Sequence, residues 1–282
     1  MMQRRGGGID ARQSTMAGFF HSEARHLSVL RLEINGQQPW FCESAQDDQR
    51  GVLFTHIHPE FAQLGGGGSG QARDERSRDA NGLPHRALEI ESVFHVRPNR
   101  LVVSATFNNR WFEPIAFEAR WLVEADFADL FTVFTAASQP AGRTPRVYTR
   151  DGLRLENASG DYATIIDMDG DATWRVEADG KLVSAVYLAR GASSRMTLSV
   201  RPLGALGMTD ADAGDRENAW LSWRRRLARI TTPGHDIAQR VITRHVEDFA
   251  SLPLLRGERD EWLTMQAGIP MYPALFGRDA LT

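Results

Sequence analysis

Strict alternation of apolar and polar residues along several short stretches limits what this chain can fold into. The clearest stretch runs from Ile115 to Glu124, where apolar residues take every second position and charged residues take most of the others. Because successive side chains of a β-strand point to opposite faces, this pattern predicts a strand with one buried face. The same alternation recurs in three further sets: Leu88, Ile90, Ser92 and Phe94; Leu101, Val103, Ala105 and Phe107; Met196, Leu198 and Val200. Many such strands predict a mainly β protein built as an antiparallel β-sandwich.

Turn-forming dipeptides separate the predicted strands. Asn35-Gly36 follows an alternating segment that ends at Ile34, and this dipeptide favours a tight hairpin turn. Asp151-Gly152 and Asp179-Gly180 mark two later hairpins. We therefore expect the β-sandwich to occupy residues 18–204.

Two stretches are expected to be flexible. Residues 1–17 begin with the basic, glycine-rich run Met1–Gly8, which lacks the apolar segment of a secretory signal. The low-complexity run Gly65–Gly70 is followed by many charged residues, which predicts a surface loop over about residues 64–84.

Composition excludes some classes of partner. The net charge is −3, so there is no electrostatic basis for binding nucleic acid or an anionic membrane. No apolar run approaches the length of a membrane span. Cys42 is the single cysteine, which excludes an internal disulfide framework and fits a reducing compartment. We expect a cytoplasmic protein that binds neither nucleic acid nor membrane.

After Pro202 the period of the pattern changes from that of strands to that of helices. A linker helix is expected within residues 205–233, with an apolar stripe of Trp220, Trp223, Leu227 and Ile230. Arg224, Arg225 and Arg226 point in different directions on such a helix, which indicates a solvated face. After a break at Pro233-Gly234, a second helix is expected over about residues 236–252. Its predicted inward-facing residues are Ile237, Val241, Val246, Phe249 and Leu252.

Histidines and carboxylates are the candidates for metal binding and catalysis in this sequence. His56 and His58 share one strand face, but a zinc site needs at least a third protein ligand and none lies nearby in the sequence. We interpret both as the end of a strand, and give His21 and His26 the same interpretation.

Asp126 and Asp129 could form a carboxylate pair for sugar hydrolysis, yet they lie three positions apart at the end of a strand. Nothing in the pattern shows that these two carboxylates converge on a substrate. We interpret both as residues that cap turns.

The last segment ends with an aromatic-Gly-Arg-Asp tetrad, Phe276 to Asp279. Arg278 offers a planar fork of hydrogen-bond donors and Asp279 offers two acceptors, which together suit a hydroxyl-rich ligand such as a sugar. The alternative is local, with Asp279 capping a helix and Arg278 making a surface ion pair.

Several segments resemble the bacterial, glycogen-debranching type of amylo-α-1,6-glucosidase. The hexapeptide Asp126-Phe-Ala-Asp-Leu-Phe131 is similar to a signature of that family's N-terminal domain, where it is not catalytic. Arg25, Leu27 and Ser28 fall at places that match the opening of the same domain. The tetrad ending at Asp279, with Gly268-Ile-Pro270 before it, resembles the entry to the family's (α/α)6 toroid.

The chain also departs from the family pattern. Thr132-Val-Phe134 stands where members commonly have Glu-Val-Arg, so any salt link made by those charges is absent. Met271-Tyr272 replaces a Trp and a second aromatic residue, which weakens the expectation of sugar stacking there.

The resemblance implies the N-terminal portion of an enzyme that hydrolyses α-1,6-glucosidic branch points in glycogen-like glucans. Two carboxylates on later toroid helices would catalyse an inverting reaction, so no catalytic residue is assigned in this chain, which is expected to be inactive alone. Residues 234–282 would begin the toroid, here truncated. The expected partners are a branched α-glucan and the downstream (α/α)6 domain, with no metal or organic cofactor. The residues expected to bind substrate are Tyr272, Phe276, Arg278 and Asp279.

Other functions stay open at this point. The chain could be a non-catalytic β-sandwich that binds glucan or docks to a partner. It could also be the N-terminal part of another (α/α)6 glycoside hydrolase, such as one that cleaves trehalose or a mannosyl compound.

Overall fold

The protein is described here by a computed structural model and is mainly β, as predicted, with 53% strand and 15% helix. The structure describes residues 7–21, 24–48, 51–60, 77–97, 99–135, 146–149, 152–177, 180–204, 210–226, 229–250, 253–256 and 261–265. It divides into two compact units, residues 1–207 and residues 208–282.

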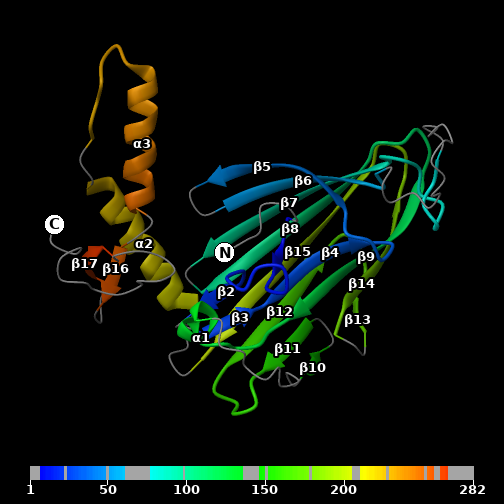
Figure 1. Ribbon diagram of the computed structural model, residues 1–282, viewed down its shortest axis with the longest axis horizontal. Helices are drawn as coiled ribbons and strands as arrows, with labels where there is room; N and C mark the ends of the chain where they lie inside the picture. Colours follow the sequence, from blue (N-terminus) through cyan, green and yellow to red (C-terminus); the bar gives the residue numbers. More distant parts are fainter. Residues whose placement is uncertain are drawn as a thin grey trace. The chain divides into compact units, whose positions relative to one another are not determined.

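The first unit is built on two antiparallel sheets (Figure 1). The larger sheet has eight strands, in the spatial order β10 (Arg146–Thr149), β11 (Gly152–Glu156), β12 (Ala163–Gly170), β15 (Ser193–Leu203), β8 (Arg100–Asn109), β7 (Leu88–Arg97), β6 (Gly51–His58) and β5 (Trp40–Asp48). The smaller sheet has five strands, in the order β1 (Ile9–Asp10), β4 (Val29–Ile34), β9 (Ile115–Glu124), β14 (Leu182–Leu188) and β13 (Arg175–Val176). A short pair, β2 (Phe19–His21) and β3 (Ala24–Leu27), and the helix α1 (Leu130–Phe134) complete this unit.

The inner faces of the two sheets share one hydrophobic core. The predicted alternation is confirmed, because every second residue of β7, β8, β9 and β15 is buried over the predicted positions. Trp121 of β9 is fully buried, and its indole Nε1 donates to the Sδ of Met196 on the larger sheet at 2.8 Å. Phe107 and Phe117 also meet across the sheets, with ring centroids 5.6 Å apart. These contacts identify the fold as the predicted β-sandwich.

The Asn35-Gly36 turn forms, but it does not join two strands of one sheet. Both residues have positive φ, 50° and 78°, and Ile34 and Gln37 exchange backbone hydrogen bonds across the turn. The next strand, β5, lies at the edge of the larger sheet, so the chain crosses the sandwich at this point. The two later hairpins, β10–β11 and β13–β14, form where the sequence predicted them.

The predicted flexible N-terminus is wrong for residues 7–17. Ile9 and Asp10 pair with β4, and Ile9 and Ala17 are buried. Ile9 supplies apolar surface that covers the open edge of the smaller sheet, and this burial orders a stretch whose composition indicated flexibility. Gly8 allows the close approach, because a Cβ there would lie 2.6 Å from the backbone oxygen of Leu30.

The end of the predicted surface loop also contributes to the core. Leu83 and Asp79 are buried, and Asp79 Oδ1 accepts from the backbone N of Leu83 at 2.8 Å. Residues 61–76, which include the glycine run, lie outside the described residues.

The second unit contains the two predicted helices, α2 (Asp210–Arg226) and α3 (Asp236–Ala250), separated by the predicted break at Pro233-Gly234. A hairpin of β16 (Pro253–Arg256) and β17 (Glu261–Met265) follows, which the sequence analysis did not predict. Within the described residues, no helix is both long and apolar enough to cross a membrane.

The predicted inward face of α3 is only partly covered. Ile237 is 72% exposed and Val241 is 49% exposed, whereas Val246 is half-buried. The inward orientation is expected for a complete toroid, and in this chain Ile237 and Val241 face solvent. The side chains of Phe249, Trp220 and Trp223 lie outside the described residues.

Replacing Trp121 tests the assignment of the core. Trp121→Ala removes a fully buried indole and leaves a cavity, so it should lower the free energy of unfolding by roughly 3–5 kcal/mol. Urea denaturation followed by circular dichroism measures the change. Leu122→Ala, on the half-buried opposite face of β9, is the matched control and should cost clearly less. Equal losses for the two variants would show that the facing of β9 is wrong.

Candidate functional site

The residues predicted to bind sugar, Tyr272, Phe276, Arg278 and Asp279, lie outside the described residues. Their role therefore stays a prediction. The other motif, Asp126 to Phe131, follows the end of β9 and lies within the described residues.

Arg25 and Asp126 form an ion pair that joins the two segments carrying the N-terminal part of the family resemblance. Arg25, on β3, is buried; its Nε donates to Asp126 Oδ1 at 2.9 Å and its Nη2 donates to Asp126 Oδ2. The Nη1 of the same guanidinium donates to the backbone oxygen of Thr15 at 2.6 Å and to that of Ala17 at 3.3 Å. A planar fork of five donors can serve these partners at once. The Arg25 side chain thus links the segment before β2 to the turn that follows β9 through hydrogen bonds to both.

Backbone hydrogen bonds run beside this ion pair. The Arg25 N donates to the Ala128 O at 2.9 Å, and the Phe127 N donates to the Arg25 O at 3.1 Å. The Ser28 N donates to the Glu124 O at 2.8 Å. Phe127 takes a φ of 51°, which is uncommon for a residue with a Cβ, and the surrounding hydrogen bonds hold it there. The hexapeptide is therefore locked against β3 by its backbone as well as by Asp126.

Asp129 caps α1, as the sequence predicted. Its Oδ1 accepts from the backbone N of Phe131 at 2.8 Å and from that of Thr132 at 3.3 Å. Asp126 Oδ1 similarly accepts from the Ala128 N at 3.3 Å. A glycosidase needs two carboxyl groups that both face the scissile bond. Because Asp126 and Asp129 are each engaged in separate local structure, they do not form such a pair.

His26 lies beside this junction and is fully buried. The hydroxyl of Thr164 donates to the His26 carbonyl at 2.9 Å, so His26 Nδ1–H is the donor toward the Thr164 Oγ1 and the Ala163 O, each at 3.2 Å. Nε2 is buried without a hydrogen-bond partner in the described part of the chain. Burial, together with the neighbouring His21, lowers the pKa of His26 to about 4. His26 is therefore held neutral.

His56 and His58 are both buried on β6, at the strand end where the sequence placed them. The His56 ring packs against the rings of Phe41 and Phe54, at centroid distances of 5.9 and 6.5 Å. His58 Nε2 lies 3.8 Å from Asp79 Oδ2. Among the described residues, no group of three His, Cys, Asp or Glu side chains is placed to hold a metal ion.

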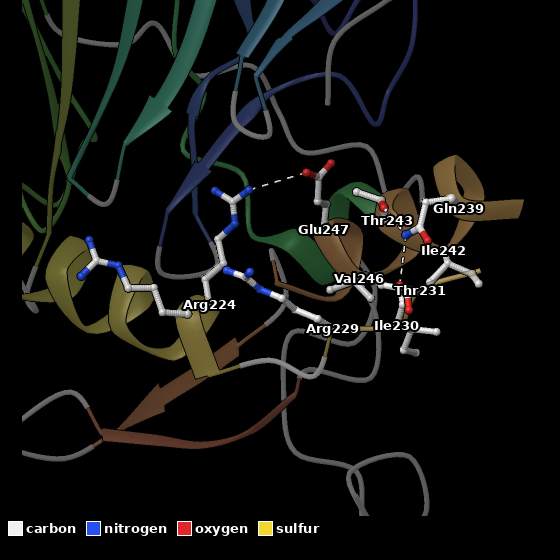
Figure 2. Close-up of a pocket in the computed structure, with 10 residues that line it drawn as sticks. Arg224, Arg229, Ile230, Thr231, Gln239, Ile242, Thr243, Val246 and Glu247 are labelled. Carbon is white, nitrogen blue, oxygen red and sulfur yellow. Dashed lines mark hydrogen bonds and ion pairs between the residues drawn. The ribbon is translucent and has the colours of Figure 1, made fainter. Parts of the chain in front are cut away.

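A pocket of about 320 Å³ lies between the end of α2 and α3 (Figure 2). Arg224 Nη2 lies 3.6 Å from Glu247 Oε1 at its rim. Gln239 braces the turn into α3, because its Oε1 accepts from the Thr232 N at 2.8 Å and its Nε2 donates to the Ile230 O at 3.0 Å. Arg224, Arg225 and Arg226 are exposed, which confirms the predicted solvated face. The pocket could accept hydroxyl or anionic groups, but its lining offers Glu247 as a carboxylate and not the pair that glycoside hydrolysis needs.

Comparison with known proteins gives the family. The profile of the N-terminal domain of (some) glycogen debranching enzymes matches residues 1–199 of the chain. The chain belongs to this family. No curated protein sequence matches it.

Solved structures similar to this debranching-enzyme domain come from several kinds of protein. A putative kojibiose phosphorylase from the human microbiome is 7% identical, with a TM-score of 0.40 over 81% of this chain and 28% of that one. Heparinase III is 10% identical, with a TM-score of 0.34 over 65% of this chain and 24% of that one. A putative aldose 1-epimerase from Escherichia coli K12 is 12% identical, with a TM-score of 0.33 over 60% of this chain and 70% of that one. The chain thus matches about a quarter of the length of the two longest of these.

Sequence reasoning found both parts of the junction in this debranching-enzyme domain but not their partnership. Arg25 and Asp126 lie 101 positions apart, and no periodicity links them. Both residues stand in segments that carry the family resemblance. That shared membership is the signal from which an ion pair between Arg25 and Asp126 could have been predicted.

A double-mutant cycle tests the ion pair. Asp126→Asn keeps the size of the side chain but removes its charge, and with it the charged hydrogen bonds to Arg25. The unfolding free energy should fall by roughly 1.5–3 kcal/mol, toward the lower end because Asp126 is partly exposed. Arg25→Lys should lower the unfolding free energy at least as much, since an ammonium cannot serve a carboxylate and two backbone oxygens in one plane. Asp129→Asn is the matched control and should change little, because Asn also caps helices. Additive effects of Asp126→Asn and Arg25→Lys would refute the coupling.

The pKa of His26 predicts a loss of stability in acid. Its folded pKa of about 4 lies below the value of about 6.5 expected when unfolded. The unfolded chain therefore binds this proton first, and stability that is complete above about pH 6.5 is lost as the pH falls toward 4, by roughly 3 kcal/mol. Urea melts at a series of pH values measure the free energy of unfolding. Between about pH 6.5 and 4 it should fall less steeply for His26→Asn than for wild type, because asparagine does not titrate. Exposed His235→Asn is the control, and equal slopes for wild type and His26→Asn would contradict the assignment.

Proposed function

We propose that this chain is the N-terminal portion of an amylo-α-1,6-glucosidase that hydrolyses α-1,6-glucosidic branch points in glycogen-like glucans. The observation that carries the proposal is the match of residues 1–199 to the N-terminal domain of glycogen debranching enzymes. The antiparallel sandwich and the locked Asp126–Phe131 turn are consistent with such a domain.

In this proposal the chemistry belongs to a helical (α/α)6 domain that accompanies the sandwich. Two carboxylates there would act on the glucosidic bond, one protonating the leaving oxygen and one activating water for an inverting reaction. The sandwich would supply a rigid support and not a catalytic group, because Asp126 and Asp129 are engaged in local structure. Tyr272, Phe276, Arg278 and Asp279 are proposed to contact the terminal glucosyl unit.

The proposed partners are a branched α-glucan and the accompanying (α/α)6 domain, and the proposed compartment is the cytoplasm. The small net charge of −3 supports a neutral partner such as a glucan, because it gives the chain no electrostatic attraction for nucleic acid or for an anionic membrane.

Glucose release from a branched limit dextrin tests the proposed function. We expect no release above a buffer blank from the purified 282-residue chain, and release from a protein that also contains the (α/α)6 domain. Linear maltoheptaose is the control substrate, because it lacks branch points. Glucose release by the 282-residue chain alone, or equal rates on both substrates in the longer protein, would refute the proposal.

In the same longer protein, Asp279→Asn tests the sugar-binding residues. Hydrogen bonds to charged groups are worth roughly 1.5–3 kcal/mol, so kcat/KM should fall roughly ten- to a few hundred-fold. Arg278→Lys should fall similarly, since lysine lacks the planar fork. Unchanged kcat/KM with a lowered melting temperature would assign both residues to a turn instead.

A further inference from the structure

An aromatic pair, Trp111 and Phe112, projects from the loop between β8 and β9. Their ring centroids lie 4.3 Å apart and their planes are tilted by 34°, so the two rings are in contact. Trp111 is half-buried and packs against the core of the sandwich. Phe112 is 59% exposed, so one of its faces is supported by protein while much of the ring meets water.

A buried side chain holds this loop in place. Asn109 Nδ2 donates to the backbone oxygens of Glu113, Leu188 and Ala189 at 2.9, 3.2 and 3.0 Å, and its Oδ1 accepts from the Trp111 N at 2.8 Å. These bonds join the aromatic loop to the turn between β14 and β15. Because the backbone of the loop is held before any ligand arrives, binding there would cost little backbone ordering entropy.

A second exposed ring lies at the same end of the smaller sheet. Tyr187, on β14, is 70% exposed and pairs with Ala116 of β9, just after the aromatic loop. Exposed Glu113 and Arg190 stand in the two neighbouring turns. The loop and the adjoining strand end therefore present exposed aromatic rings and charged hydrogen-bonding groups.

The size of this surface separates its possible ligands. An aromatic side chain has roughly 150–250 Å² to bury, so the exposed parts of Phe112 and Tyr187 offer roughly 200–300 Å² together. A stable protein interface buries about 800 Å² on each partner. Two rings within a charged rim are too small for a protein partner but match one or two sugar units.

We propose that Phe112, supported by Trp111 and flanked by Tyr187, is a stacking platform for the glucose units of an α-glucan chain. The face of an aromatic ring carries partial negative charge, which attracts the polarised C–H groups on the apolar face of a pyranose. Glu113 can accept hydrogen bonds from the hydroxyl groups at the edge of the sugar ring, and Arg190 can donate to them. The choice of an α-glucan rests on the proposed function.

Binding of maltoheptaose and retention in gels that contain glycogen test the platform with the full 282-residue chain. Phe112→Ala should weaken binding about tenfold, because stacking energy and buried area are both lost. Phe112→Leu keeps an apolar side chain without a ring face and should weaken binding nearly as much, whereas Phe112→Tyr should bind like wild type. Trp40→Ala removes an exposed aromatic residue on β5 and is the control that should change nothing. Thermal melts show whether each variant is folded.

Three results would overturn the platform. Equal retention of wild type, Phe112→Ala and Phe112→Leu would remove Phe112 from glucan binding and leave the hydrolytic function standing. Retention on a β-linked glucan but not on glycogen would reject the α-glucan and count against the proposed function as well. Self-association that Phe112→Ala abolishes, with no glucan binding, would show that the rings contact protein.

Discussion

Two antiparallel sheets can each bury only one face, and the rest of this structure depends on burying those two faces against each other. Trp121 shows the constraint at its tightest, because it is fully buried on the smaller sheet and its only polar atom reaches Met196 on the larger one. The alternation of the strands sets which side chains enter this core. The crossing after Asn35-Gly36 then carries the chain from the smaller sheet to the larger one, and the pairing of Ile9 with β4 covers an edge of the smaller sheet.

The Arg25–Asp126 ion pair adds a specific constraint to this general one. Burial of apolar faces would leave the turn after β9 free to take several paths, whereas one guanidinium holds Asp126, Thr15 and Ala17 together. Asp126 and Asp129, the two acids of the family-like hexapeptide, thus both serve local structure.

Local pattern was enough to predict the alternating strands of the sandwich, two hairpins, the caps at Asp126 and Asp129, and the two helices, because each depends on neighbours within a few residues. Long-range pairing could not be predicted in the same way. Residues 7–17 look flexible by composition, yet an open sheet edge orders them. The hairpin β16–β17 was missed for a related reason, since a pairing of two strands depends on more than the periodicity of either one.

A comparison of kinetics and melting for Asp126→Asn separates a structural from a catalytic role most directly. It requires an enzyme that contains this chain and hydrolyses branched glucan. If Asp126 serves to hold Arg25, the melting temperature falls while kcat/KM, measured well below that temperature, stays within about twofold of wild type. A loss of kcat/KM by about a hundredfold or more, with an unchanged melting temperature, would contradict a structural role for the motif.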